Sequence, residues 1–123
     1  MISNLEEIEK IWQGGDNTPL YTPKVIKKNF EKCLNLNEER LPLYLGKTEK
    51  LQTRLENHIN GKRDSKTYSL KLRQRSNLDL SKIQLAYYEI PFDMALSPEI
   101  KQLFLTTLEQ KLRNKLFPLV GKK

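Results

Sequence analysis

The beginning of the chain has the apolar spacing of a short amphipathic helix. Ser3 and Glu6 form a capping box at its start, and the helical pattern stops before Gly14 and Gly15. The apolar stripe consists of Leu5, Ile8, Ile11 and Trp12. We therefore expect residues 1–16 to form an N-terminal amphipathic helix that packs against a single domain of residues 17–123.

The pattern changes over residues 41–59, where a short strand is expected to lead into a helix. The alternating apolar residues of the strand are Leu41, Leu43 and Leu45. Pro42 restricts that strand to a sheet edge or to its first residues. After Thr48, the predicted N-cap, the spacing becomes helical. The inward stripe of this helix consists of Leu51, Leu55 and Ile59. Arg54 and His58 are four residues apart and share another face.

The strongest helix signal lies near the end of the chain. Ser97 is a predicted N-cap, Pro98 is the first helical residue and Pro118 ends the helix. The predicted buried stripe consists of Ile100, Leu103, Phe104, Leu108, Leu112 and Leu116. Glu109 lies at the edge of this stripe, where a carboxylate must be paired, protonated or bound to a metal. Arg113, four residues later, is the candidate partner for an ion pair.

Two further segments are candidates for strands. Residues 83–90 are rich in β-branched and aromatic side chains and alternate between two faces, which predicts a strand that Pro91 stops. Residues 24–30 alternate weakly and suit either a first strand or the start of a helix. With the strand at residues 41–45, these segments predict an α/β (α+β) domain. We expect a small mixed or antiparallel sheet of about three strands, flanked by helices.

Charge is distributed unevenly along the chain. The whole chain carries +7 and residues 1–16 carry −3, so the remaining residues carry +10. A basic body suits a polyanion such as nucleic acid. One cysteine and one histidine exclude an internal disulfide and a zinc site made of these residue types. With no long apolar run and no signal-like leader, we expect a cytoplasmic protein without membrane contact.

The positive charge is concentrated after the central helix. Residues 61–75 carry +5, with a tyrosine among the cations. Lys and Arg release counterions from phosphates, and tyrosine can stack or donate a hydrogen bond. The residues expected to contact nucleic acid are Lys62, Arg63, Lys66, Tyr68, Lys71, Arg73 and Arg75. The alternative is a solvated basic loop that binds nothing.

The run Tyr44-Leu45-Gly46-Lys47, followed by Arg54 and His58, resembles the second half of the GIY-YIG nuclease signature. In that family the YIG motif precedes a helix that carries an arginine and, one turn later, a histidine or tyrosine. Glu109, ahead of Phe117-Pro118, resembles the family's metal-binding glutamate, which lies on a helix before a terminal proline. The resemblance implies the GIY-YIG fold, a three-stranded sheet with flanking helices.

The chain departs from the family pattern at two places. It has no Gly-Ile-Tyr triplet before Tyr44, and Leu20-Tyr21 is the nearest candidate for the first motif. Gly121 stands where family members often carry an asparagine, which leaves Asn114 as a candidate substitute.

The resemblance implies a divalent-metal-dependent DNA endonuclease of restriction, mobile-element or repair type. Glu109 would hold Mg²⁺ or Mn²⁺, while Arg54 and Lys47 would bind the scissile phosphate. The proton acceptor would be His58, Tyr44 or Tyr21. Cutting both strands would require a homodimer or a second encounter. The alternatives are a nucleic-acid-binding module with a decayed site and a repair subunit that needs a partner protein.

Overall fold

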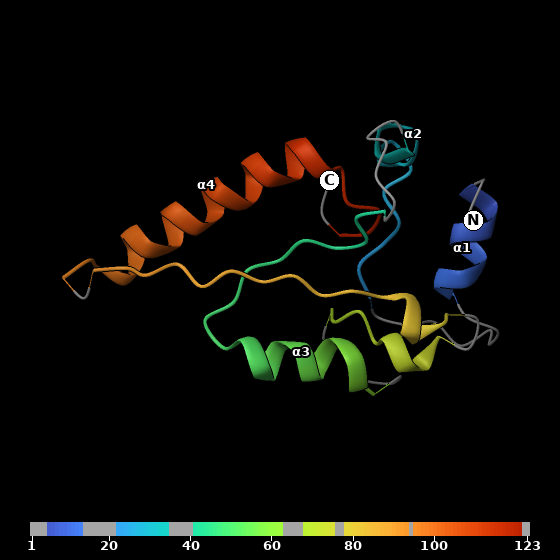
Figure 1. Cartoon of the computed structure of the whole chain (residues 1–123), viewed down its shortest axis with the longest axis horizontal. Helices are drawn as coiled ribbons and strands as arrows, with labels where there is room; N and C mark the ends of the chain where they lie inside the picture. Colours follow the sequence, from blue (N-terminus) through green and yellow to red (C-terminus); the bar gives the residue numbers. More distant parts are fainter. Residues whose placement is uncertain are drawn as a thin grey trace.

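The computed structural model describes residues 5–13, 22–34, 41–62, 68–75, 78–93 and 95–121. In these ranges the regular elements are all helical. The α-helices are α1 (Leu5–Gln13), α2 (Asn29–Leu34), α3 (Leu51–Asn60) and α4 (Pro98–Leu116), and the 3-10 helices are η1 (Leu72–Gln74) and η2 (Leu80–Lys82). Two extended segments, residues 41–50 and 83–93, run between α4 on one side and α3 on the other (Figure 1).

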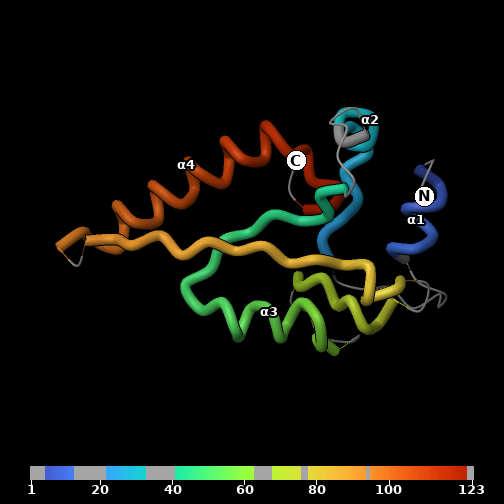
Figure 2. Tube along the Cα trace, viewed as in Figure 1, coloured from blue at the N-terminus to red at the C-terminus, as the bar shows by residue number. Residues whose placement is uncertain are grey.

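The predicted three-stranded sheet is wrong, because the described residues contain no β-strand and the fold is α-rich. Val25 and Val120 form an isolated antiparallel bridge. Beside it, Leu119 and Val120 donate their backbone N–H groups to the carbonyls of Pro42 and Leu43 at 3.0 and 2.9 Å. The chain after α4 thus returns to lie beside the start of the 41–50 segment (Figure 2).

The physical reason for the missing sheet lies in the two predicted strands. Pro42 has no backbone N–H to donate. In its pairing with the chain after α4, the 41–45 segment therefore mainly accepts hydrogen bonds through its carbonyl groups. Residues 84–89 are exposed on both of their alternating faces, and within the described ranges no backbone hydrogen bond pairs them with another segment. Alternation along these residues therefore does not correspond to one buried and one solvated face.

The core forms where α1 meets the chain after α4. Two clusters of buried apolar residues share partly buried Val25: Ile8, Phe30 and Leu119 in one, and Trp12, Leu70, Leu72 and Val120 in the other. The Trp12 indole Nε1 donates to the Pro23 carbonyl at 2.8 Å. The helix predicted from the N-terminal stripe is present and contributes to both clusters, whereas Ser3 of the expected capping box lies outside the described residues.

The boundaries of α4 agree with the sequence signals, but its burial does not. Ser97 Oγ accepts the Ile100 N–H at 3.3 Å, and Pro98 is the first helical residue. The predicted buried stripe is wrong, since no residue of α4 is buried and the most exposed apolar ones are Ile100 (52%), Leu103 (68%) and Phe104 (52%). Without a sheet, the helix has no broad apolar surface to cover. No helix in the described ranges, α4 included, is long and apolar enough to cross a membrane.

Helix α3 begins later than the sequence predicts. Its N-cap is Lys50, which makes no side-chain cap, and the Thr48 hydroxyl instead accepts the Lys50 N–H at 3.0 Å. This local hydrogen bond stabilises a turn ahead of the helix and leaves Glu49 outside the first helical turn. The buried residue of α3 is His58, whereas Leu51 of the predicted inward stripe is exposed.

Candidate functional site

Tyr44 folds back over Gly46. A Cβ atom added to Gly46 would lie 2.8 Å from Tyr44 Cε1 and 3.0 Å from its hydroxyl oxygen. The phenol therefore occupies the space that a side chain at position 46 would need. Gly121, from the chain after α4, lies near the ring, because a Cβ there would be 3.7 Å from Tyr44 Cδ2.

His58 is buried beside this phenol. The ring centroids of Tyr44 and His58 are 5.0 Å apart, and the His58 Nδ1 accepts the Leu70 backbone N–H at 2.9 Å. Because Nδ1 is an acceptor, a neutral imidazole carries its proton on Nε2. Burial, followed by the nearby Arg54 charge, lowers the pKa of His58 to about 4. The imidazole is therefore neutral near pH 7 and has an Nε2–H to donate.

Lys47 attaches the turn before α3 to the middle of α4. Its Nζ donates to the hydroxyl of Thr106 and, at 3.5 Å, to Oε1 of Gln102. The other end of the same amide, Gln102 Nε2, donates to Oε1 of Glu49 at 3.0 Å. Two side chains of the turn thus meet two side chains on successive turns of α4.

Glu109 lies on the same face of α4 as these contacts. Residues 102, 106, 109 and 113 are spaced by four, three and four positions, which places them in one row along a helix. Thr106 and Glu109 are separated by a rise of about 4.5 Å along the axis. The carboxylate is partly buried and accepts a hydrogen bond from Arg113 at 2.8 Å, so the ion pair expected from their spacing is present.

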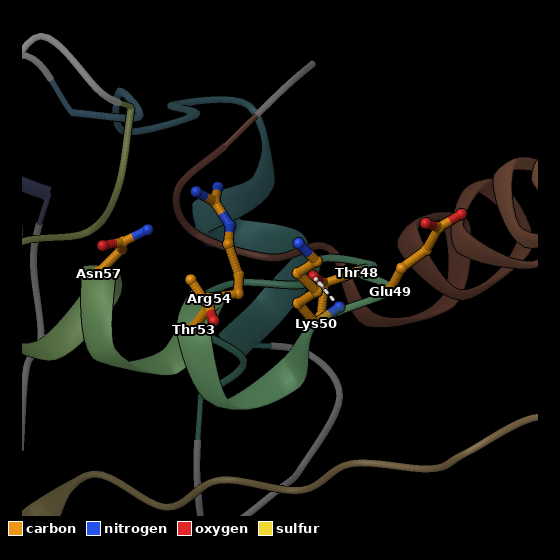
Figure 3. Close-up of a pocket in the computed structure, with 6 residues that line it drawn as sticks. All are labelled: Thr48, Glu49, Lys50, Thr53, Arg54 and Asn57. Atoms are coloured by element: carbon orange, nitrogen blue, oxygen red, sulfur yellow. Dashed lines mark hydrogen bonds between the residues drawn. The ribbon is translucent and has the colours of Figure 1, made fainter.

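Arg54 lines an open hollow of about 350 Å³ at the start of α3. The other lining residues are Thr48, Glu49, Lys50, Thr53 and Asn57. Figure 3 shows Arg54 and Asn57 projecting from the same side of α3, while the Glu49 carboxylate points away from them toward a neighbouring helix. The N–H groups of a first helical turn lack intrahelical acceptors and add positive potential. Two cations at such a helix end suit a phosphate group.

Sequence reasoning identified Arg54 but missed Lys50, Thr53 and Asn57 as its neighbours in the hollow. A signal for two of them was present in the spacing. Lys50 lies four residues before Arg54 and Asn57 three residues after it, so all three share one side of a helix that begins near Lys50.

The only carboxylate proposed as a metal ligand is Glu109, so its surroundings decide which kind of ion site fits. In the described ranges no group of three or more His, Cys, Asp or Glu side chains is arranged to hold an ion. Arg113 binds Oε1 of Glu109, and no other residue that the structure describes forms a hydrogen bond with Oε2. Mg²⁺ commonly uses one or two carboxylates and completes its shell with water and phosphate oxygens. Glu109 fits a site of that one-carboxylate type.

The basic stretch at residues 61–75 divides into buried and exposed cations. Lys71 and Arg75 are only 0% and 2% exposed, and the Arg75 guanidinium lies 3.4 Å from the centre of the Trp12 ring. Their charged ends are inside the molecule. The predicted nucleic-acid contacts that the structure describes as exposed are Lys62, Tyr68 and Arg73, and these three stay candidates for that role. Arg63 and Lys66 lie outside the described residues.

The structure thus brings the predicted residues together in two groups joined by residues 44–50. One group contains Tyr44 and His58, with Arg54 on the same helix, and the other connects Lys47 to the α4 face that carries Glu109. Tyr21 lies outside the described residues. The amide oxygen of Asn114 accepts from Gln110 at an exposed position of α4.

Comparisons with known proteins identify no relative of this chain. No family model, curated protein or solved structure matches the chain. Any statement about function therefore depends on the chemistry of the residues described above.

Proposed function

We propose that this chain is a divalent-metal-dependent endonuclease that hydrolyses phosphodiester bonds in DNA. The supporting observation is the Lys47–Thr106 contact, which attaches the YIG-like turn to the α4 face that bears Glu109. Phosphodiester hydrolysis needs cations for the developing negative charge, a proton acceptor for the water and an oriented phosphate. The turn, α3 and α4 supply residues of each type.

We assign phosphate binding to the cations near the start of α3. Arg54 and Lys50 line the hollow, and the planar guanidinium of Arg54 can bind two phosphate oxygens at once. Both acceptors of Lys47 among the described residues are neutral, so neither of them offsets its positive charge. In the proposed reaction Arg54 orients the scissile phosphate, and Lys47 stabilises the negative charge.

We assign the role of proton acceptor to Tyr44 rather than to His58. The Nδ1 of His58 is committed to the Leu70 N–H, and the imidazole is neutral with its proton on Nε2. This arrangement suits a positioning role beside the phenol. We therefore assign proton acceptance to the Tyr44 oxygen, which can take a proton from the attacking water only in its deprotonated, phenolate form, and ring orientation to His58.

Glu109 would hold the divalent ion, Mg²⁺ or Mn²⁺, through the oxygen that Arg113 leaves open. When bound, such an ion polarises a phosphate oxygen and stabilises the departing oxyanion. Arg113 restrains the Glu109 side chain, which reduces the freedom that metal binding would otherwise have to remove.

A nucleic-acid-binding module without catalysis is the second candidate. It is favoured by the ion pair between Glu109 and Arg113, which gives the carboxylate a partner without any metal. Such a module would bind DNA in a salt-dependent way through its exposed cations and would cut nothing.

Nicking of supercoiled plasmid tests the proposal. We expect the wild-type chain to nick DNA with Mg²⁺ and to stop when the ion is chelated. Glu109→Gln should reduce the rate about 100-fold or more. Glu99→Gln is the matched control, because Glu99 is an exposed carboxylate in the first turn of the same helix. Salt-dependent binding without metal-dependent nicking would replace the nuclease with the binding module.

A homodimer and a cytoplasmic location remain part of the proposal. One site cuts one strand, so cleavage of both strands would need a second copy or a second encounter. The sedimentation of the chain at micromolar concentration, alone and with a DNA duplex, distinguishes these two routes.

A further inference from the structure

The amide of Gln102 lies between an ammonium and a carboxylate of the same turn. Its Oε1 accepts from Lys47 at 3.5 Å, and its Nε2 donates to Glu49 at 3.0 Å. The orientation of the amide is fixed by chemistry, because an ammonium only donates and a carboxylate only accepts. Gln102 therefore separates two opposite charges that are two residues apart in the sequence.

Without this amide, Lys47 and Glu49 would be free to attract each other directly. Both side chains are exposed and flexible, and unit charges of opposite sign attract at contact distance even near solvent. An ammonium paired with a carboxylate is a poorer partner for a phosphate, because the carboxylate repels the incoming anion. Thr106, the second acceptor of Lys47, is neutral as well.

We propose that Gln102 is a positioning residue that keeps Glu49 away from Lys47 and so reserves the Lys47 charge for a phosphate of the nucleic-acid backbone. The inference rests on the proposed function, since it takes DNA as the ligand. An ammonium has three N–H donors, and among the described residues Lys47 has two acceptors, which leaves one donor for a phosphate oxygen.

The test is the salt dependence of binding to a DNA duplex in the presence of a chelator, so that no cleavage occurs. Lys47→Met should reduce the slope of log K against log salt by about 1, because one phosphate contact is lost. Gln102→Leu should give the same loss. Adding Glu49→Ala to Gln102→Leu should restore the wild-type slope, because the competing carboxylate is then absent. A helix-docking role for Gln102 would not be rescued in this way.

The matched control is Gln110→Leu, which removes an exposed amide from the same helix together with its hydrogen bond to Asn114. Its salt slope should equal that of the wild type. An unchanged slope in Gln102→Leu, a loss that Glu49→Ala does not restore, or a wild-type chain that binds no DNA would overturn the inference. The expected slopes without Mg²⁺-dependent nicking would instead overturn the nuclease and leave the role of Gln102 intact.

Discussion

His58 is held neutral by its surroundings, and this has a consequence for stability. Burial and the Arg54 charge lower the pKa of the folded imidazole to about 4, whereas an unfolded histidine titrates near 6.5. Between these values the unfolded chain binds the proton first, so the free energy of unfolding falls as pH is lowered through this window. The loss from this group should approach about 3 kcal/mol at pH 4.

Urea unfolding at pH 7 and pH 4 measures this effect against His58→Asn. The asparagine oxygen can still accept the Leu70 N–H but has no charge to gain. The variant should therefore lose about 3 kcal/mol less than the wild type over the same pH interval. Equal losses in both proteins would show that His58 is not held neutral.

Gly46 and Gly61 should respond differently to alanine. In Gly46→Ala the three atoms nearest to the new Cβ are the outer ring atoms and the hydroxyl of Tyr44, so we expect the phenol to shift while the fold is retained. Displacement of a proton acceptor by about 1 Å costs roughly 100-fold in cleavage rate. In Gly61→Ala the Cβ would lie 2.4 Å from the Asn57 backbone carbonyl oxygen, which cannot move aside cheaply. Cleavage kinetics and thermal unfolding should separate the two variants. A Gly46→Ala variant that cleaves DNA as fast as the wild type would remove Tyr44 from the proposed reaction.

At the residue scale, the sequence could predict the contacts that depend on local spacing. The Glu109–Arg113 pair follows from positions four apart on a helix. The burial of Lys71 and Arg75 could not be predicted, because Arg75 packs on Trp12, which is 63 residues away in the chain. From the sequence alone, a row of cations indicates a solvated surface, because nothing nearby in the chain shows that a distant aromatic residue will cover one of them.

At the scale of elements, helix ends were predictable and strand pairing was not. Ser97 and Pro98 specify the start of α4 through their own hydroxyl and ring. Pairing in a sheet instead depends on which segments meet. The chain after α4 donates its hydrogen bonds to the carbonyls of Pro42 and Leu43, which a neighbouring strand of the predicted sheet would otherwise use. The predicted burial of α4 was wrong for the same reason, because the sheet that would have covered its apolar stripe is absent from the described residues.

Helix α1 provides the element-scale prediction. Trp12 belongs to the buried cluster that contains Leu70, Leu72 and Val120. It also donates a hydrogen bond to Pro23 and stacks with Arg75. Trp12→Ala should therefore lower the free energy of unfolding by about 3 to 5 kcal/mol, whereas Ile11→Ala, at a half-buried position of the same helix, should cost less. Urea unfolding followed by circular dichroism measures both. A negligible effect of Trp12→Ala would mean that α1 is an appendage outside the core.

At the scale of the whole molecule, composition suggests a class of ligand but says nothing about the arrangement of the site. A charge of +7 leads us to propose a polyanion as the ligand, and the YIG-like run leads us to propose nuclease chemistry. Which helix faces that run is a property of the folded chain. Helices α3 and α4 lie on opposite sides of residues 41–50, and the turn before α3 reaches α4 through Lys47 and Glu49 (Figure 1).

The central claim is that Arg54 on α3 and Glu109 on α4 act on one phosphodiester. A double-mutant cycle of single-turnover cleavage rates, with Arg54→Lys, Glu109→Gln and the double variant, measures this directly. Groups that serve the same transition state give non-additive losses, so the double variant should be about as slow as the slower single variant. A loss in the double variant equal to the product of the two single losses, or a Glu109→Gln rate equal to that of the wild type, would contradict the shared site.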